Sequence, residues 1–265
     1  MLNRWEVFGM TMKRRKFLKV SAASVGAVLA AGLIYRGTRR SDPLHDVYKS
    51  TEKVLTAHFG KERTAEIMRE IRTNYTSLTP SVPYIGGKEN MFTEWLTYGV
   101  YYLAVYRVLK PLGYSMDQIG EVIYKTYEDM ADYPKWFLRI VGRLKYGGSY
   151  TSRLRLAVED SQKGQYPCGW VGTFVKGNGH QFDYGIDMTE CGIWKSYVAH
   201  NAQELAPYMC LSDYVVSKAF DRGLVRHYTI AEGGDRCDFR YKKGRETFVY
   251  PLRNGWPPRF LNKHG

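Results

Sequence analysis

Four cysteines carry most of the chemistry that this sequence offers, and three of them lie close to charged residues. Cys191 ends a segment of alternating polarity, and Cys237 directly precedes Asp238. Cys210 is followed three positions later by Asp213. A cysteine thiolate attacks an electron-poor carbon when a nearby positive charge lowers its pKa. Thiolates that cluster with a carboxylate or an imidazole instead bind a metal ion that activates water.

Motifs of other reaction types are absent from the sequence. It contains no Walker loop, no dinucleotide-binding glycine fingerprint, no Gly-x-Ser-x-Gly and no His-Glu-x-x-His. The six histidines are scattered without metal-ligand spacing. The candidates for chemistry therefore lie near the three cysteines, with Cys168 slightly apart.

Each candidate also has a purely structural explanation. A cysteine is often a small buried residue, and in an oxidising compartment four cysteines form two disulfides with three possible pairings. Asp213 is suited to capping the start of a helix. Arg226 and Arg240 also fit surface positions of strands, and His227 need not be a ligand.

The elements that must position these residues change character at Gly164. Before Gly164, apolar residues recur at helical spacing, which predicts helices over 41–71, 91–110, 115–130 and 134–144. Ser115 and Gln118 form a capping box at the start of the third helix. Beyond Gly164 the spacing predicts strands over 170–175, 182–191, 224–231 and 236–241, with helices over 192–206 and 212–221.

Strand parity tests which candidates share a face. A two-residue turn at Gly233-Gly234 would set Ile230 opposite Cys237, so that Arg226 shares the face of Cys237. Asp238, Arg240 and His227 would then lie on the opposite face. We therefore expect one site formed by four residues and a structural role for Asp238. The four are Cys237, Arg226, Cys191 and Asp213.

The order of elements predicts an α+β fold, with an N-terminal helical part packed on a small antiparallel sheet of two hairpins (β-β-α-α-β-β). No strand–helix–strand alternation supports a parallel sheet. No linker divides the helices from the strands, so we predict a single domain over 41–250. The proline-containing tail, 251–265, is expected to be irregular.

The first 40 residues have the pattern of an export signal. Lys13-Arg14-Arg15-Lys16-Phe17-Leu18-Lys19 matches the twin-arginine pattern, and the apolar run 20–34 follows it. At about 15 residues the run is short for a bilayer-spanning helix, which needs about 20. The segment predicts a twin-arginine translocase as a partner and an exported protein. That protein is either periplasmic or anchored to the outer face of the cytoplasmic membrane by an uncleaved segment.

The net charge of +13 does not indicate nucleic-acid binding. Residues 1–40 hold nine Lys and Arg and one Glu, which leaves +5 for residues 41–265. No RNA-binding or zinc-finger motif and no lysine-rich tail is present.

Four blocks in series resemble the L-2-amino-thiazoline-4-carboxylic acid hydrolase family. They are Thr189-Glu190-Cys191-Gly192-Ile193, Cys210-Leu211-Ser212-Asp213-Tyr214, Arg226-His227-Tyr228-Thr229-Ile230-Ala231 and Cys237-Asp238-Phe239. The similar stretch runs from about residue 165 to 242, with weaker helical similarity before it. His227 departs from the family pattern, where a smaller hydroxyl residue is expected.

The resemblance implies hydrolysis of a small cyclic amidine or isothiourea, such as 2-amino-thiazoline-4-carboxylate. Water adds to the carbon between the ring sulfur and nitrogen, and the ring opens to a carbamoyl-cysteine. The expected catalytic residues are Cys237, Cys191, Cys210 and Asp213. Arg226, Arg240 and His227 are expected to bind substrate, an arginine clamping the carboxylate.

The sequence leaves the cofactor and two alternative functions open. The cofactor is unknown, and a divalent metal held by Cys191, Cys210 and Cys237 is one possibility. The alternative function is an exported, non-catalytic accessory protein that binds a metal or a small acid. A scaffold with disulfides and a helical partner surface is the third hypothesis.

Overall fold

The computed structural model describes residues 4–7, 10–13 and 44–249. Strand β1 (Arg4–Val7) pairs with β2 (Met10–Lys13) in an antiparallel hairpin. The predicted twin-arginine signal with its apolar run, the predicted helix start at 41–43 and the tail 251–265 lie outside these residues. Among the described helices, none combines the length and the apolar character that crossing a bilayer requires.

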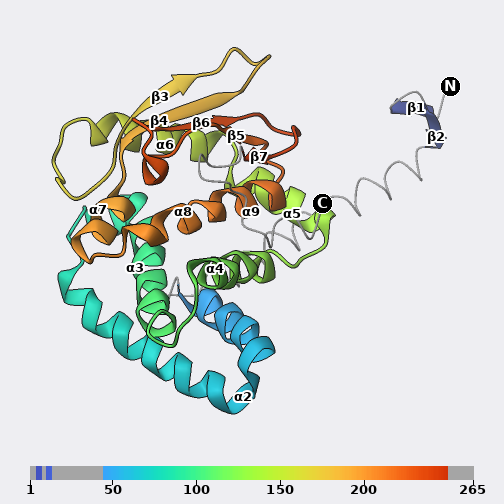
Figure 1. The fold of residues 1–265 in the computed structure, drawn as a ribbon. Helices are drawn as coiled ribbons and strands as arrows, with labels where there is room; N and C mark the ends of the chain where they lie inside the picture. Colours follow the sequence, from blue (N-terminus) through green and yellow to red (C-terminus); the bar gives the residue numbers. More distant parts are fainter. Residues whose placement is uncertain (1–3, 8–9, 14–43, 250–265) are drawn as a thin grey trace.

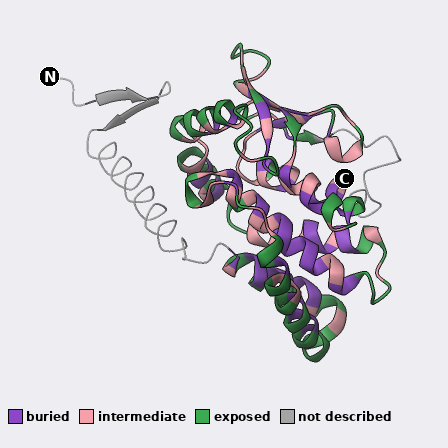
Figure 2. Cartoon of the chain, turned by 90° about the vertical axis from the view of Figure 1, so that its left-hand side faces the viewer, coloured by how far each residue is buried: buried purple, intermediate pink, exposed green. Residues whose placement is uncertain are grey.

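The predicted N-terminal helices are confirmed. They are α2 (His45–Leu78), α3 (Phe92–Leu109) and α4 (Met116–Met130). Helix α2 bends at Gly60, whose φ of 73° is a conformation that glycine adopts without strain. The capping box is present, since the Ser115 hydroxyl accepts from Gln118 N–H and the Gln118 side chain accepts from Ser115 N–H. The apolar faces of α2, α3 and α4 form much of the large buried core seen in Figure 2.

The fourth predicted helix is α5 (Lys135–Lys145), which begins after Pro134. A further helix, α6 (Gly148–Ser161), was not predicted from the sequence. Its mixed surface carries exposed residues around most of its circumference and buries only Leu154 and Val158. Such a pattern gives a weak periodic signal, so α6 is visible only in the folded chain.

The predicted α+β class is confirmed, with an antiparallel sheet of β3 (Val171–Lys176), β4 (Tyr184–Glu190), β6 (Cys237–Tyr241) and β5 (Leu224–Arg226), in that order. A short β7 (Phe248–Val249) adds to β5 in the parallel direction, which the sequence did not predict. Ile186 and Met188 of β4 are buried, as the alternation predicted.

A helix boundary predicted between these strands was wrong. The helix expected over 192–206 ends early, as α7 (Gly192–Ala199), and the chain turns at Asn201, whose φ is 53°. It then forms the 3-10 turn Gln203–Leu205, α8 (Ala206–Met209) and α9 (Leu211–Ala219). Asparagine tolerates the left-handed region better than most residues, so a local turn replaced the continuous helix.

The second hairpin also differs from its prediction. Strand β5 ends at Arg226, and Ile230–Glu232 form a 3-10 turn closed by Gly233. The register pairs Leu224 with Tyr241, two residues away from the predicted alignment. A slip of two keeps every side chain on its predicted face. Gly223, directly before β5, has a positive φ of 60°, and a Cβ there would lie 1.9 Å from the Lys242 carbonyl oxygen. A glycine is therefore required where the chain enters β5.

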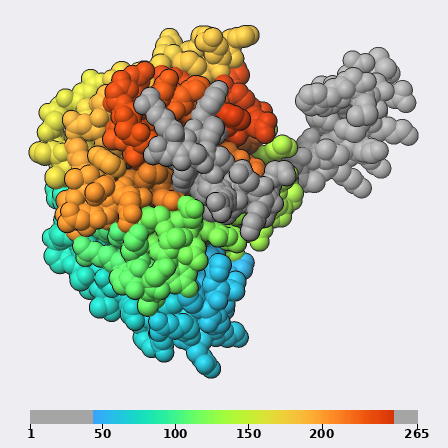
Figure 3. Space-filling model, viewed as in Figure 1, coloured from blue at the N-terminus to red at the C-terminus, as the bar shows by residue number. Residues whose placement is uncertain are grey.

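The domain consists of three layers (Figure 1). The sheet lies above, α7 to α9 run below it, and α3, α4 and then α2 follow. In the face shown in Figure 3, residues 190–220 separate the helical half from the strands at the C-terminal end. Glycines permit this close stacking, because a Cβ on Gly120 of α4 would lie 1.9 Å from the Tyr208 ring of α8. The candidate residues occupy the boundary between the sheet and the middle layer.

Candidate active site

Three thiols from three elements approach one another under the sheet. Cys191 caps the start of α7, Cys210 lies between α8 and α9, and Cys237 begins β6. The charges of Cys191 and Cys237 both act on the pKa of Cys210, and that of Cys191 acts on Cys237. We call Cys191, Cys210 and Cys237 the thiol cluster. All four cysteines of the chain are free, which does not support the alternative of two disulfides.

If β4 continued through Cys191, strand parity would place this residue on the face opposite to Met188. Met188 pairs with Cys237, so both side chains point toward the helices. Strand β4 ends at Glu190, and the chain then enters α7. The turn into the helix therefore brings Cys191 to the side of Cys237.

An ion pair joins the thiol cluster. Arg226, whose side chain is only 3% exposed, donates to Asp213 Oδ2 at 2.7 Å and to the Cys210 carbonyl oxygen at 3.0 Å. Its guanidinium also lies 5.2 Å from the centroid of the Phe239 ring. Asp213 is in the first turn of α9 and is 40% exposed. Asp213 is thus the partner of a buried cation, and its carboxylate reaches solvent.

Burial keeps the thiols protonated. It raises the pKa of Cys237 to about 12 and that of Cys210 well above its usual value. Arg226 opposes this effect at both residues, but burial is the larger cause. An apolar environment disfavours the charged form of any group. A resting thiolate is therefore not favoured at Cys237, the residue that the sequence suggested first.

Cys191 has the surroundings best suited to a thiolate. Burial raises its pKa too, but hydrogen bonds from Trp194 N–H, Ile193 N–H and the Trp170 side chain oppose the rise. The Trp194 nitrogen lies 3.5 Å from the sulfur. These donors belong largely to the N-terminus of α7, where backbone N–H groups and the helix dipole favour negative charge. Cys237 accepts one such bond, from Ile230 N–H at 3.3 Å.

The metal site that the sequence left as one possibility does not fit the geometry. Within residues 44–249 no three His, Cys, Asp or Glu side chains are grouped closely enough to hold a metal ion. We therefore derive no reaction step through a metal.

The remaining candidates lie away from the thiol cluster. Asp238 accepts hydrogen bonds from the backbone N–H groups of His227 and Tyr228 and from His227 Nδ1, and thereby fixes the chain after β5. Arg240 pairs with Asp187 at 2.8 Å. Strand parity places Asp238 and Arg240 on the face opposite to Cys237. The structure does not bring them to Asp213.

Sequence reasoning missed the residues that the helical half contributes. Tyr127 of α4 hydrogen-bonds with Ser212, and burial raises its pKa well above the usual value, with smaller contributions from Asp213 and Glu94. Tyr98 of α3 also acts on Tyr127. Each residue fits the apolar or polar pattern of its own helix. No local signal distinguishes these residues from ordinary core and surface positions.

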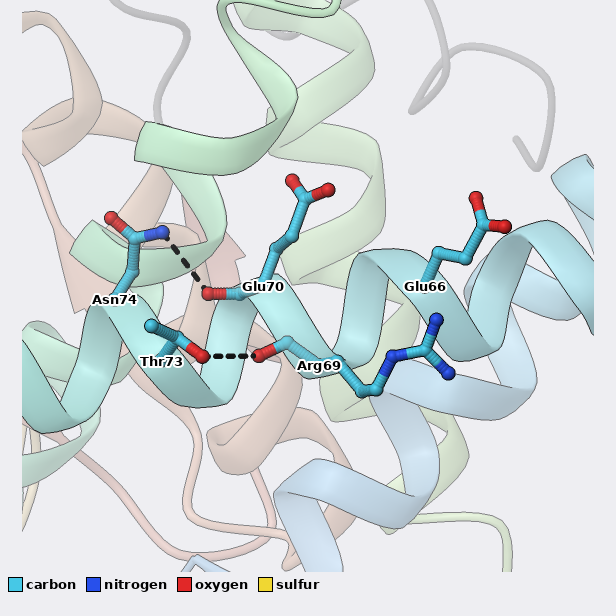
Figure 4. Close-up of a pocket in the computed structure, with 5 residues that line it drawn as sticks. All are labelled: Glu66, Arg69, Glu70, Thr73 and Asn74. Atoms are coloured by element: carbon cyan, nitrogen blue, oxygen red, sulfur yellow. Dashed lines mark hydrogen bonds between the residues drawn. The ribbon is translucent and has the colours of Figure 1, made fainter.

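The surface of the described part of the chain contains a cavity near the thiol cluster and a depression far from it. One, of about 160 Å³, lies between the 86–92 loop and α6, and Trp170 forms one of its walls. The Trp170 ring also packs against Gly192, next to Cys191, so this cavity borders the thiol cluster. The other is a depression over one face of α2 (Figure 4). Its Thr73 and Asn74 side chains bond to backbone carbonyls of the same helix, so it shows no built site.

Comparison with known proteins identifies the part of the chain that contains this site. Residues 156–241 match a family model. Its description is L-2-amino-thiazoline-4-carboxylic acid hydrolase. The match contains the whole thiol cluster together with Asp213 and Arg226, and it supports the family resemblance over about the stretch expected from the sequence. Neither a curated protein nor a solved structure matches the chain.

Proposed function

We propose that this protein hydrolyses a small cyclic amidine or isothiourea, such as 2-amino-thiazoline-4-carboxylate, at the thiol cluster. One observation carries the proposal. The stretch that matches the hydrolase family holds three thiols, a carboxylate and a guanidinium: the charge of Asp213 acts on the pKa of all three thiols, and Arg226 donates to Asp213. These are the groups that nucleophilic attack and proton transfer at an amidinium carbon require.

Cys191 is the proposed nucleophile. Three hydrogen-bond donors face its sulfur, whereas the sulfur of Cys237 accepts from one backbone N–H. When a cationic amidinium enters, its positive charge adds to these donors and favours the thiolate. The protonated resting state fits this order of events, because the thiol ionises only when substrate is bound.

The reaction proceeds in two steps. First, the sulfur of Cys191 bonds to the carbon between the ring sulfur and nitrogen, and the bond from that carbon to the ring sulfur breaks. The thiol proton passes through Asp213 to the departing sulfur. Water then adds to the same carbon, and the bond to Cys191 breaks. One water proton returns to Cys191 and the other to a substrate nitrogen, so one water molecule is consumed and a carbamoyl-cysteine is released.

Asp213 is proposed to hold the amidinium and to carry the proton. Its charge acts on the pKa of all three thiols, and its carboxylate is 40% exposed. Arg226 acts through Asp213, because its own guanidinium is buried and donates to Asp213 and to the Cys210 carbonyl. In this arrangement Arg226 orients the carboxylate of Asp213.

The test is turnover by the purified full chain, with and without added divalent metals. The substrate is 2-amino-thiazoline-4-carboxylate in ¹⁸O-labelled water, and the product is detected by mass spectrometry. We expect a carbamoyl-cysteine carrying one ¹⁸O. Cys191→Ser is expected to abolish turnover, and Asp213→Asn to reduce it by at least about 100-fold. Cys168→Ser is the matched control, because Cys168 is exposed and should leave turnover unchanged.

The outcomes separate the alternatives. Activity that survives in Cys191→Ser but not in Asp213→Asn would replace cysteine attack by direct attack of water, with Asp213 as the base. Saturable binding without product would favour the accessory-protein function. If the protein neither binds the substrate nor forms the product, the proposed substrate class is rejected.

A further inference from the structure

The positive charge of the domain is concentrated in one segment. Residues 133–158 contain six Lys and Arg and no Asp or Glu, whereas residues 41–265 as a whole carry a net charge of only +5. Four of the six basic residues belong to α5, which has eleven residues. The rest of the domain is therefore close to neutral, and α5 stands out as a basic element.

Helix α5 is amphipathic, with one side buried against the protein. Leu138, Val141 and Gly142 are its buried residues. The approach to α9 is tight, because a Cβ on Gly142 would lie 2.6 Å from the carbonyl oxygen of Phe220. At 100° per residue, the opposite side presents positions 136, 139, 140, 143 and 144. This side is fixed in orientation by the packing of the buried one.

Large apolar side chains alternate with the cations on that outer side. Trp136 is 59% exposed and Leu144 is 50% exposed, and Arg139 and Arg143 lie between them. Tyr133, also 50% exposed, stands just before the helix. We call these five residues the basic–apolar face.

The charges of the basic–apolar face are weakly engaged within the protein. Arg139 approaches Asp221 at 3.8 Å, with both side chains well exposed, and a surface pair of this length contributes little. Arg143 has no ion pair with any residue of the described chain. Its charge is therefore available to a partner.

We propose that the basic–apolar face docks on an anionic lipid surface. Cations beside exposed tryptophan and leucine are the features of segments that lie in the membrane interface, where tryptophan and tyrosine settle at headgroup level and lysine and arginine bind anionic headgroups. A nucleic acid would use the cations but would leave Leu144 without a contact. The membrane surface uses both classes of side chain.

The face would act together with the N-terminal segment that the sequence predicts to be an export signal or anchor. An anchor tethers the chain to the membrane but does not fix which side of the domain faces the bilayer. Docking through α5, whose buried side is packed against the protein, would orient the domain against the bilayer. The inference is independent of the proposed hydrolase activity, because none of its residues belongs to the thiol cluster.

The test compares partition of the full chain onto neutral phosphatidylcholine vesicles and onto vesicles with 30% phosphatidylglycerol. The N-terminal segment is the same in every variant, so its contribution cancels when the ratio of the two partition coefficients is compared between a variant and the wild type. Each basic residue near an anionic surface is worth about a fivefold change in partition. We expect the ratio to fall about 25-fold in the double variant R139Q/R143Q. The matched control is K61Q/R63Q on α2, which removes two exposed basic residues and should leave the ratio unchanged.

A second readout reports insertion. Brominated lipid is expected to quench part of the tryptophan emission on anionic vesicles, and W136F should remove that part. An unchanged partition ratio in R139Q/R143Q would overturn the proposal, as would equal quenching of the wild type and W136F. Loss of duplex-DNA binding in R139Q/R143Q with an unchanged lipid ratio would assign the face to nucleic acid instead.

Discussion

Removing Asp213 should destabilise the fold much more than removing its ion-pair partner, Arg226. In Asp213→Ala, the guanidinium of Arg226 stays 3% exposed and loses the carboxylate at 2.7 Å. An uncompensated buried charge costs about 3–5 kcal/mol. The carbonyl of Cys210 still accepts one hydrogen bond, which places the expected loss near the lower end of that range.

In Arg226→Met, the group left behind is Asp213, which is 40% exposed and is solvated by water. The pair is already screened on the carboxylate side, so its loss should cost only about 1 kcal/mol. Methionine also retains the apolar contact of the Arg226 stem with Phe239. The double variant contains no buried charge at this place, so it should be more stable than Asp213→Ala by about 2 kcal/mol.

The assay is urea unfolding of the four proteins, followed by circular dichroism at one pH and salt concentration. Stability differences are compared as a double-mutant cycle. Two results would refute the reasoning: a loss in Arg226→Met at least as large as in Asp213→Ala, or additivity of the two single variants within about 0.5 kcal/mol. Either would mean that the guanidinium is not held as a buried charge by Asp213.

Three further predictions follow from burial and packing. Native protein at pH 8 should be alkylated rapidly at exposed Cys168 alone, and at all four cysteines after denaturation, as counted by mass spectrometry; fast labelling of Cys237 would contradict its burial. Because the pKa of Cys237 is higher in the folded than in the unfolded chain, its contribution to the free energy of unfolding is complete below pH 9. This contribution should be lost as pH rises from 9 toward about 12, by about 1.4 kcal/mol per pH unit in urea titrations, with a shallower fall in Cys237→Ala. Gly120→Ala should cost at least about 2 kcal/mol, because its Cβ would overlap a tyrosine ring, whereas Gly148→Ala meets no atom within 4 Å and should be neutral or slightly stabilising in the same unfolding assay.

The sequence was informative wherever a structural rule acts over a few residues. Helical spacing predicted α2 to α5, and the side-chain chemistry of Ser115 and Gln118 predicted a capping box that the structure contains. Alternation placed Arg226 on the face of Cys237. That placement survived an incorrect register, because the actual pairing differs by two residues and parity is unchanged.

Local rules failed where the chain changes direction. A left-handed turn at Asn201 ends α7, and a 3-10 turn replaces the predicted second half of β5. Strand parity likewise cannot place Cys191, because it holds only while a strand continues and β4 ends at Glu190. Helix α6 escaped prediction because its buried side is too narrow to produce a clear period.

The sequence by itself determined the class of fold, the order of most helices and strands, and which residues of β5 and β6 share a face, because these depend on spacing along the chain. Only the tertiary structure decided that Arg226 pairs with Asp213, that Trp170 and Tyr127 border the site, and that Cys191 rather than Cys237 is the better-supported thiol. The reason is physical. The ionisation of a thiol depends on its burial and on all charges and donors around it, and these come from residues far apart in sequence.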